Sequence, residues 1–345
     1  MFIQLQYKDM KRYGNLWKHI ITYENCKLAI ENAARGKHDR REVINVTRFD
    51  DQYAKKLSLI LKLHKFLYKV SPYKFVKIND NSKERELAKL PFFPDKVIQW
   101  AIMLIMEPYF MKIFLPHTCA SIKGRGISYL QKLMNKYIKE KPLYCLKIDV
   151  KKFYPSIDHE VLKKLLRWKF KDNELLILLD KIIDSYPKLG LPIGSYLSQF
   201  LANYYLTPFD HYCKDKLHLK YIVRYMDDVV IMHDDKEYLH KIRLLLDDYL
   251  KNKLKLTMKS NWQIFPIASR PIDFGGYRFS YNFTLLRNST KKRMTRKLKK
   301  GLPFNEKNRS IVASYQGWLN SCDSFRLQRK YITPILNAWH NQGVI

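Results

Sequence analysis

The fold is predicted most clearly by one segment, residues 221–232: Tyr221-Ile222-Val223-Arg224-Tyr225-Met226-Asp227-Asp228-Val229-Val230-Ile231-Met232. Two apolar runs rich in strand-forming residues are joined by Asp227-Asp228, and this pattern predicts a β-hairpin with two carboxylates at its tip. Aspartate is common in turns because its side chain bonds to the nearby backbone, so the pair alone is weak evidence for catalysis. Stronger evidence requires a third acid elsewhere in the chain.

Asp149 is that third acid. It stands at the end of the apolar run 143–150 (LYCLKIDV), which predicts a buried strand. If this strand lies beside the hairpin, three carboxylates converge at one edge of a sheet. Carboxylates that lie close together repel unless a cation lies among them, and hard oxygen ligands suit Mg²⁺. Two such ions can bind the attacking and leaving oxygens of a phosphoryl transfer.

The remaining pattern predicts an α+β fold. Helical and basic character extends over residues 1–70, and a short strand is expected at 73–78. A long helix is expected after Pro94. Further expected elements are helices at 159–186, 196–206 and 236–254, a second hairpin at 273–287 and a basic helical tail from residue 289. This order favours a sheet that carries acids at its turns and is covered by helices on its back.

Charge and composition favour a polyanionic partner. Lys and Arg total 64 against 32 Asp and Glu, and aromatic residues make up 14% of the chain. Cations neutralise phosphates and rings stack on bases, so nucleic acid fits this composition. Five scattered cysteines without a CxxC pair indicate reduced thiols rather than a zinc site or disulfides. The start, MFIQLQYKDMKRY, lacks a signal-peptide core, so a soluble cytoplasmic protein without a membrane partner is expected.

Tyr225-Met226-Asp227-Asp228 resembles the YxDD box of reverse transcriptases. Four other segments resemble further boxes of that family in the same order: the first palm motif, the second palm motif, the primer-grip hairpin and the start of a bacterial thumb helix. They are 149–157 (DVKKFYPSI), 190–199 (GLPIGSYLSQ), 274–279 (FGGYRF) and 314–319 (SYQGWL). The resemblance implies a right-hand polymerase with fingers, a ferredoxin-like palm sheet and a helical thumb. The expected domains are a basic helical extension at 1–70, fingers at 71–142, a palm with finger elements and the primer grip at 143–288, and a thumb at 289–345.

The resemblance also implies roles for the residues that match these motifs. Asp149 and Asp227 are expected to bind two Mg²⁺ ions, with Mn²⁺ as an alternative, and the carbonyl of Val150 to add a ligand. Asp228 is expected to support the primer end, and Lys259 to protonate the leaving pyrophosphate. A solvated turn acid and a surface lysine are the alternative interpretations of the last two.

Nucleotide and template contacts follow from the same resemblance. Tyr154 is expected to lie under the incoming sugar and to exclude a 2′-hydroxyl, which favours dNTPs. The other expected dNTP-binding residues are Lys83, Arg85, Ile193, Gly194, Ser198 and Gln199. The expected template and primer contacts are Lys123, Arg125, Phe274, Gly275, Gly276, Tyr277, Lys291, Lys292 and Arg293. For the basic runs, a solvated surface is the alternative interpretation.

The second palm motif departs from the commoner family pattern. Group II intron and retron enzymes carry Gln-Gly and Ser-Pro, whereas this chain has Ile193-Gly194 and Ser198-Gln199. That loop resembles the low-fidelity enzymes of diversity-generating retroelements, and antiphage defence enzymes also vary here. The chain is therefore expected to make cDNA from an RNA template, a dedicated noncoding RNA, in one of these two settings. An accessory protein or a homo-oligomer is a further expected partner.

Two other functions compete with this interpretation. An RNA-dependent RNA polymerase shares the palm chemistry, but Tyr154 and the YMDD sequence argue against it. A non-catalytic, polymerase-like RNA-binding subunit has no need of three acids, and all three are present.

Overall fold

The computed structural model describes residues 12–80, 83–187 and 189–344. The N-terminal segment on which the signal-peptide expectation rests lies largely outside the described residues. The chain divides into two compact units. The first unit takes its described residues from Met1–Ile122, Asp149–His218 and Leu244–Ser260; the second unit comprises Lys123–Ile148, Leu219–Arg243 and Asn261–Ile345.

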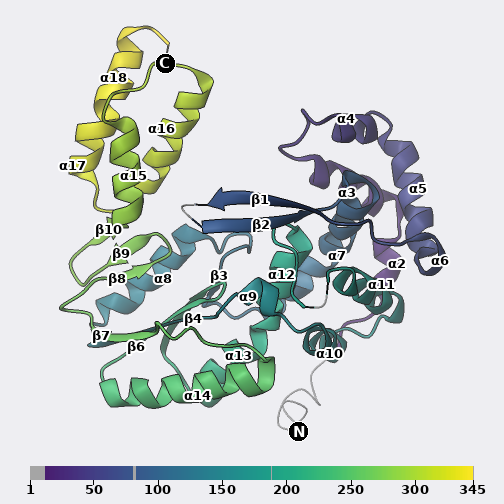
Figure 1. Cartoon of the computed structure of the whole chain (residues 1–345), viewed down its shortest axis with the longest axis horizontal. Coiled ribbons are helices and arrows are strands. Elements are labelled where there is room, and N and C mark those ends of the chain that lie inside the picture. Colours follow the sequence, from purple (N-terminus) through teal and green to yellow (C-terminus); the bar gives the residue numbers. More distant parts are fainter. Residues whose placement is uncertain (1–11, 81–82, 188, 345) are drawn as a thin grey trace. The chain divides into compact units, whose positions relative to one another are not determined.

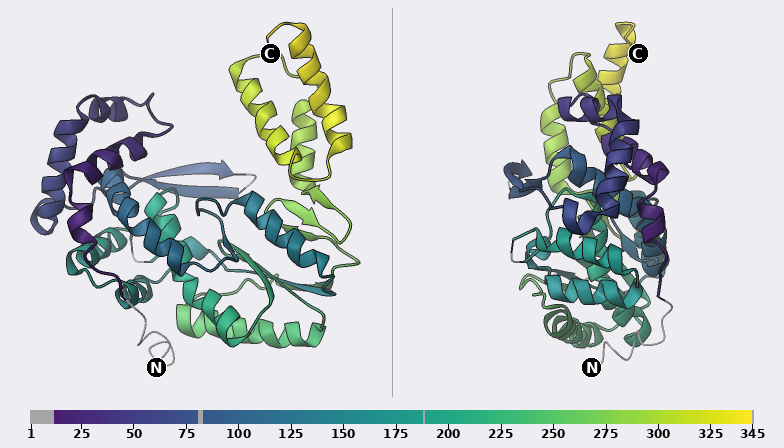
Figure 2. Two further views of the ribbon diagram at one scale, coloured as in Figure 1. Left: turned by 180° about the vertical axis from the view of Figure 1, so that it is seen from behind. Right: turned by 90° about the vertical axis from the view of Figure 1, so that its right-hand side faces the viewer.

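Helices dominate the N-terminal part of the first unit (Figure 2). They are α2 (Trp17–Ile20), α3 (Tyr23–Ala34), α4 (Arg41–Arg48), α5 (Asp50–Lys62), α6 (His64–Leu67), the π-helical turn η1 (Phe92–Lys96) and α7 (Val97–Ile113). Helix α3 packs against both α5 and α7. The Asn25 amide donates to the carbonyls of Ile20 and Ala101, which joins α3 to α2 and to α7. The expected N-terminal helices and the long helix after Pro94 are confirmed for the described residues.

A two-stranded ribbon, β1 (Lys74–Asp80) with β2 (Lys83–Lys89), belongs to the same unit (Figure 1). Its strands are antiparallel, and Lys74 pairs with Lys89 at its base. The expected strand at 73–78 is confirmed. The unit also contains the short strand β3 (Thr118–Cys119).

The rest of the first unit is again helical. It contains α9 (Phe153–Ser156), α10 (His159–Lys169), α11 (Asn173–Asp184), α12 (Tyr196–Tyr205), α13 (Thr207–His211) and the π-helical turn η2 (Tyr212–Lys216). The helical region expected at 159–186 is two helices, because Phe170 adopts an extended backbone and forms a bridge to Tyr13. Asp172 then accepts hydrogen bonds from the backbone of Asn15 and Leu16.

The second unit is built on a sheet in which four strands lie in the order β5-β6-β4-β7. These strands are β5 (Tyr221–Tyr225), β6 (Asp228–His233), β4 (Tyr144–Asp149) and β7 (Gln263–Pro266). Strands β5 and β6 form the expected antiparallel hairpin, and β4 pairs antiparallel with β7. Helix α8 (Ile127–Lys139) packs on β5, and α14 (Lys236–Leu254) begins in this unit and ends in the first.

A smaller sheet and a helical bundle complete the second unit. The sheet has the order β10-β9-β8, with β8 (Ile272–Phe274), β9 (Tyr277–Phe279) and β10 (Thr284–Leu286). The hairpin expected at 273–287 is thus three-stranded, because a turn closed by Ser280 N and Phe283 O (2.9 Å) brings a third strand back. The bundle contains α15 (Asn288–Leu298), α16 (Glu306–Leu319), α17 (Phe325–Leu327), the π-helical turn η3 (Gln328–Ile332) and α18 (Thr333–Asn341) (Figure 1).

No helix among the described residues combines the length and the apolar character needed to span a bilayer.

Candidate active site

The tip of the β5–β6 hairpin carries the acidic pair in a two-residue turn. Tyr225 and Asp228 are the closing pair, and Met226 and Asp227 connect them. Met226 has φ +54, in the left-handed region that is unfavourable for a residue with a Cβ. The turn therefore needs support from the structure around it.

Arg224 supplies such support. Its side chain is fully buried in β5, and its Nη1 donates a hydrogen bond of 2.8 Å to the carbonyl oxygen of Met226. A buried cation is costly unless it is hydrogen-bonded, so this contact stabilises both the guanidinium and the turn. Sequence reasoning did not identify Arg224, although a lone charge inside an apolar strand was a signal for it.

Within the second unit, Lys147 of β4 lies near the acidic turn. Its Nζ lies 3.9 Å from Asp228 Oδ1 and donates a hydrogen bond to the carbonyl of Asp273 at 2.7 Å. Strand β4 lies next to β6, and it ends two residues after Lys147, at Asp149. Within the second unit, the Lys147 side chain therefore lies near Asp228, the first residue of β6.

Within the first unit, Asp149 contacts Lys259. Lys259 Nζ forms an ion pair with Asp149 Oδ2, and Lys259 N donates to the Asp149 carbonyl at 2.8 Å. Val150 forms an antiparallel bridge with Met258. The expected general acid thus lies directly against one expected metal ligand.

The other carboxylate oxygen of Asp149, Oδ1, tests whether a metal ion fits beside this residue. Asp149 Oδ1 is buried and has no hydrogen-bond partner among the described residues. A buried, unsatisfied oxygen is costly, and a hard cation would compensate for it. Within the described parts of the chain, no group of three or more His, Cys, Asp or Glu side chains forms a ready metal cluster. Asp149 is assigned to the first unit, and Asp227 and Asp228 to the second.

The loop that begins at Gly190 lies against the segment that carries Tyr154. Gly190 N donates to Ile157 O at 2.8 Å, and Leu191 N donates to Tyr154 O at 3.0 Å. Gly190 has φ +92, and a Cβ there would lie 2.8 Å from Pro155 Cα and from Tyr154 O. Only glycine fits this approach. The structure therefore brings the expected sugar gate and the expected base-contacting loop together.

The other loop residues occupy the start of α12 and its surroundings. Ser195 caps the helix by accepting from Ser198 N at 3.3 Å, and its hydroxyl also bonds to Gln99. Ser198 is buried, whereas Gln199 is half-buried. Ile193 and Gly194 line a pocket of about 260 Å³ that also reaches the end of β2.

Four cations line this pocket, which we call the basic pocket: Lys37, Arg40, Lys89 and Lys96. Burial lowers the pKa of Lys37 and of Lys96, and the neighbouring cations lower both further. The rings of Trp100 and Tyr196, which also line it, stack at 4.5 Å. Positive charge beside aromatic rings suits a phosphate-bearing nucleotide. Sequence reasoning missed these cations, although the basic run at 35–41 was a signal for two of them, Lys37 and Arg40.

The expected basic contacts lie in three places. Lys83 and Arg85 are on β2, in register with Asp80 and Ile78. Lys123 and Arg125 lie in the loop before α8, where Lys123 is exposed and the space around Gly124 is open. Exposed cations on α15 complete the set, opposite the buried Met294 and Leu298; these are Lys291, Lys292 and Arg293.

The expected primer-grip segment packs into the interior of the second unit. Phe274 is fully buried, and Tyr277 stacks on Trp318 and donates to its carbonyl at 3.0 Å. A Cβ on Gly276 would lie 2.5 Å from the Trp318 ring. Any nucleic-acid contact by this segment therefore involves its backbone rather than the rings of Phe274 and Tyr277.

Comparison with known families agrees with this geometry. The family model described as reverse transcriptase (RNA-dependent DNA polymerase) matches residues 76–279. This match covers more than half of the chain and includes Asp149, Tyr154, the 190–199 loop and the YMDD turn. The chain belongs to the reverse transcriptase family, and the α+β polymerase fold expected from the sequence is confirmed.

Among curated proteins, similar sequences include a group II intron-encoded protein and an intron maturase. Group II intron-encoded protein LtrA of Lactococcus lactis subsp. cremoris is 24% identical over 329 residues, covering 73% of this chain and 55% of LtrA. Nuclear intron maturase 4, mitochondrial, of Arabidopsis thaliana is 33% identical over 143 residues, covering 37% of this chain and 17% of that protein. This chain thus spans about half or less of the length of these relatives. Among solved structures, telomerase from Candida albicans aligns with a TM-score of 0.49 and 14% identity, covering 64% of this chain and 47% of that one.

Proposed function

We propose that this chain is an RNA-directed DNA polymerase that joins deoxynucleotides on an RNA template by two-metal nucleotidyl transfer. The observation that carries the proposal is the 3.9 Å approach of Lys147 to Asp228. It supports a palm edge to which β4 and the acidic turn both contribute. Asp149 Oδ1 is buried and has no hydrogen-bond partner among the described residues, which supports a cation beside Asp149.

Asp149, Asp227 and the carbonyl of Val150 would hold two Mg²⁺ ions, or Mn²⁺ in their place. When bound, such ions neutralise charge on the phosphates and lower the pKa of the primer hydroxyl. Asp228 supports the primer end. Lys259, which pairs with Asp149, would give a proton to the leaving pyrophosphate.

Other residues around the proposed metal site would bind the nucleotide and the template–primer. Tyr154 excludes a 2′-hydroxyl, and the loop with Ile193, Gly194, Ser198 and Gln199 contacts the new base pair. Lys83 and Arg85 bind the triphosphate, because cationic side chains form charge-assisted hydrogen bonds to phosphate oxygens. The exposed Lys123, the neighbouring Arg125 and the α15 cations contact the template–primer backbone, which positions the duplex without reading its sequence. The backbone at Phe274–Tyr277 supports the primer.

We further propose a role in a diversity-generating retroelement or in antiphage defence, in the cytoplasm. The support is the Ile193-Gly194 and Ser198-Gln199 loop, which departs from Gln-Gly and Ser-Pro. A dedicated noncoding RNA would serve as template, and an accessory protein or a second copy of the chain would complete the assembly. A genomic neighbourhood with a repeat pair and a variable gene would favour diversification, whereas a noncoding RNA among defence genes would favour immunity.

The test is primer extension by the purified chain on a defined RNA template with Mg²⁺. Incorporation of dNTPs and little incorporation of rNTPs is the expected result. Incorporation of rNTPs alone would identify an RNA-dependent RNA polymerase. RNA binding without any metal-dependent synthesis would identify a non-catalytic subunit.

A further inference from the structure

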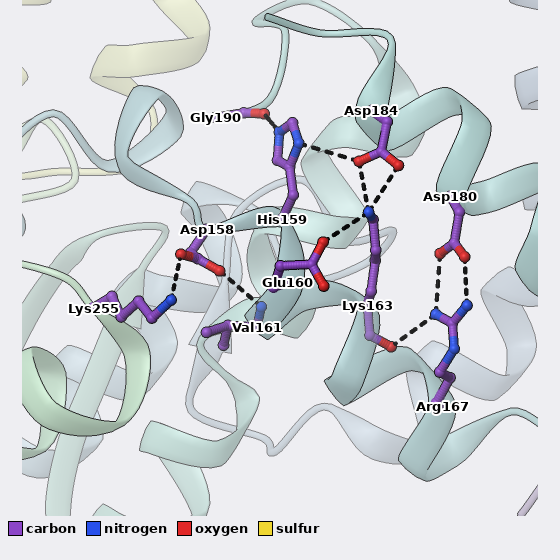
Figure 3. A network of polar contacts seen from close by, with 10 residues as sticks. All are labelled: Asp158, His159, Glu160, Val161, Lys163, Arg167, Asp180, Asp184, Gly190 and Lys255. Carbon is purple, nitrogen blue, oxygen red and sulfur yellow. Dashed lines mark hydrogen bonds and ion pairs between the residues drawn. The ribbon is translucent and has the colours of Figure 1, made fainter. Parts of the chain in front are cut away.

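Backbone and side-chain hydrogen bonds fasten the start of the 190–195 loop to the segment that follows Asp149, and Figure 3 shows the one from a side chain. Two are the backbone bonds from Gly190 N and Leu191 N. The third joins His159 Nε2 to the carbonyl oxygen of Gly190 at 2.7 Å. His159 is 7% exposed and is the first residue of α10.

The partners of His159 define how its ring is held. A carbonyl oxygen only accepts, so Nε2 must carry the hydrogen. The other ring nitrogen, Nδ1, lies 3.5 Å from Asp184 Oδ1 on α11. The carboxylate of Asp184 is in turn bound by Lys163 of α10 at 2.7 Å, and Lys163 also contacts Glu160. The ring thus lies between α11 and the loop, and its hydrogen bond runs from Nε2 to Gly190 (Figure 3).

We propose that His159 is a positioning residue that sets the spacing between the sugar gate Tyr154 and the loop carrying Ile193 and Gly194. This inference rests on the proposed function, because it assigns His159 to the nucleotide site of that polymerase. His159 touches no substrate; it acts through Gly190, whose neighbour Leu191 bonds to the carbonyl of Tyr154. If Tyr154 and this loop are displaced relative to one another, the site selects less well between closely similar substrates.

The same pair of helices supplies a matched control. Arg167 of α10 and Asp180 of α11 form an ion pair in which Nη1 lies 3.0 Å from Oδ1. In Figure 3 this pair lies further along the two helices, away from Gly190. Loss of the Arg167 pair weakens the α10–α11 contact without removing a bond to the loop. A general effect of helix packing would therefore appear in both variants, and a positioning effect only at His159.

The experiment compares His159→Phe, His159→Gln and Arg167→Met in single-nucleotide primer extension. His159→Phe keeps the ring but removes the donor, and about a tenfold rise in KM for dNTP and about a tenfold loss of dNTP-over-rNTP preference are expected, with a smaller change in kcat. His159→Gln keeps an N–H donor and should restore part of the preference. Arg167→Met should behave as the unmodified chain. An unchanged preference in His159→Phe, or an equal change in Arg167→Met, would overturn the proposal.

A second measurement separates this inference from the proposed function. Amide hydrogen exchange across residues 189–195 reports the loop whether or not the chain polymerises. Faster exchange there in His159→Phe but not in Arg167→Met is the expected result, and equal exchange in the two variants would contradict the role of His159. If the unmodified chain incorporates no nucleotide but His159→Phe shows the faster exchange, the polymerase assignment fails. The role of His159 in holding the loop is then retained.

Discussion

The buried guanidinium of Arg224 donates a hydrogen bond of 2.8 Å to the carbonyl oxygen of Met226. Met226 has φ +54 and stands directly before Asp227. A charged group inside the sheet thus holds the strained turn from which the acidic side chains project. The conformation of the turn that carries the proposed metal ligand Asp227 thus depends on a buried residue of β5.

Replacing Arg224 with Met should therefore lower kcat much more than it raises KM for dNTP. Loss of a charge-assisted hydrogen bond costs about 1.5–3 kcal/mol, which corresponds to roughly a tenfold to hundredfold loss of rate if the turn shifts. Arg224→Lys should retain more activity because it keeps a donor. Steady-state kinetics with thermal unfolding as a control would measure this, and full activity in a folded Arg224→Met chain would refute it.

Tyr154→Ala should increase rNTP incorporation relative to dNTP incorporation, because the ring proposed to collide with the 2′-hydroxyl is removed. Tyr154→Phe is the matched control: it keeps the ring and should keep the selectivity. The ratio of the two kcat/KM values on one template measures the effect. If the ratio stays constant in Tyr154→Ala while synthesis continues, another residue excludes the hydroxyl.

Ile193→Gln should reduce misincorporation. An amide restores a polar contact that the apolar Ile193 cannot offer to the new base pair, and each ~1.4 kcal/mol of discrimination changes selection tenfold. Sequencing cDNA made by both proteins on one RNA template measures the error spectra. Identical spectra would show that this loop does not set fidelity, and would shift weight from diversification toward defence.

Asp158 gives a prediction about stability and pH. It caps α10 by accepting from Val161 N at 2.9 Å, and it binds Lys255 Nζ at 2.7 Å. Burial alone would raise the pKa of Asp158, but the hydrogen bonds from Lys255 and Val161 outweigh it and hold the pKa below its ordinary value. The stabilisation is therefore present above the unfolded-state pKa of about 3.9 and is lost as the pH falls through the lower folded-state pKa.

Asp158→Ala should lower the free energy of unfolding at pH 7 by about 1–2 kcal/mol, and Asp158→Asn by less, because asparagine still caps a helix. Urea unfolding at pH 7 and at decreasing pH tests both points. A difference between the unmodified chain and Asp158→Asn that persists unchanged below the folded-state pKa would contradict the assigned ion pair.

Local features of the fold could be predicted from the sequence alone. The β5–β6 hairpin, the strand ending at Asp149 and the long helix α7 follow from short-range apolar patterns, and the structure contains all three. Features that depend on distant partners were missed. The His159–Gly190 bond joins residues 31 positions apart, and the burial of Tyr277 depends on Trp318, 41 positions away. The third strand, β10, lies within the hairpin expected at 273–287, but the turn closed by Ser280 and Phe283 that separates it from β9 was not foreseen.

Asp227→Asn removes one charged oxygen from the proposed metal site while keeping the size of the side chain. The measurement is Mg²⁺-dependent dNTP incorporation on an RNA template, with RNA binding measured in parallel. A loss of synthesis of several orders of magnitude, with RNA binding largely retained, is the expected result. Synthesis by Asp227→Asn at a rate close to that of the unmodified chain would contradict it.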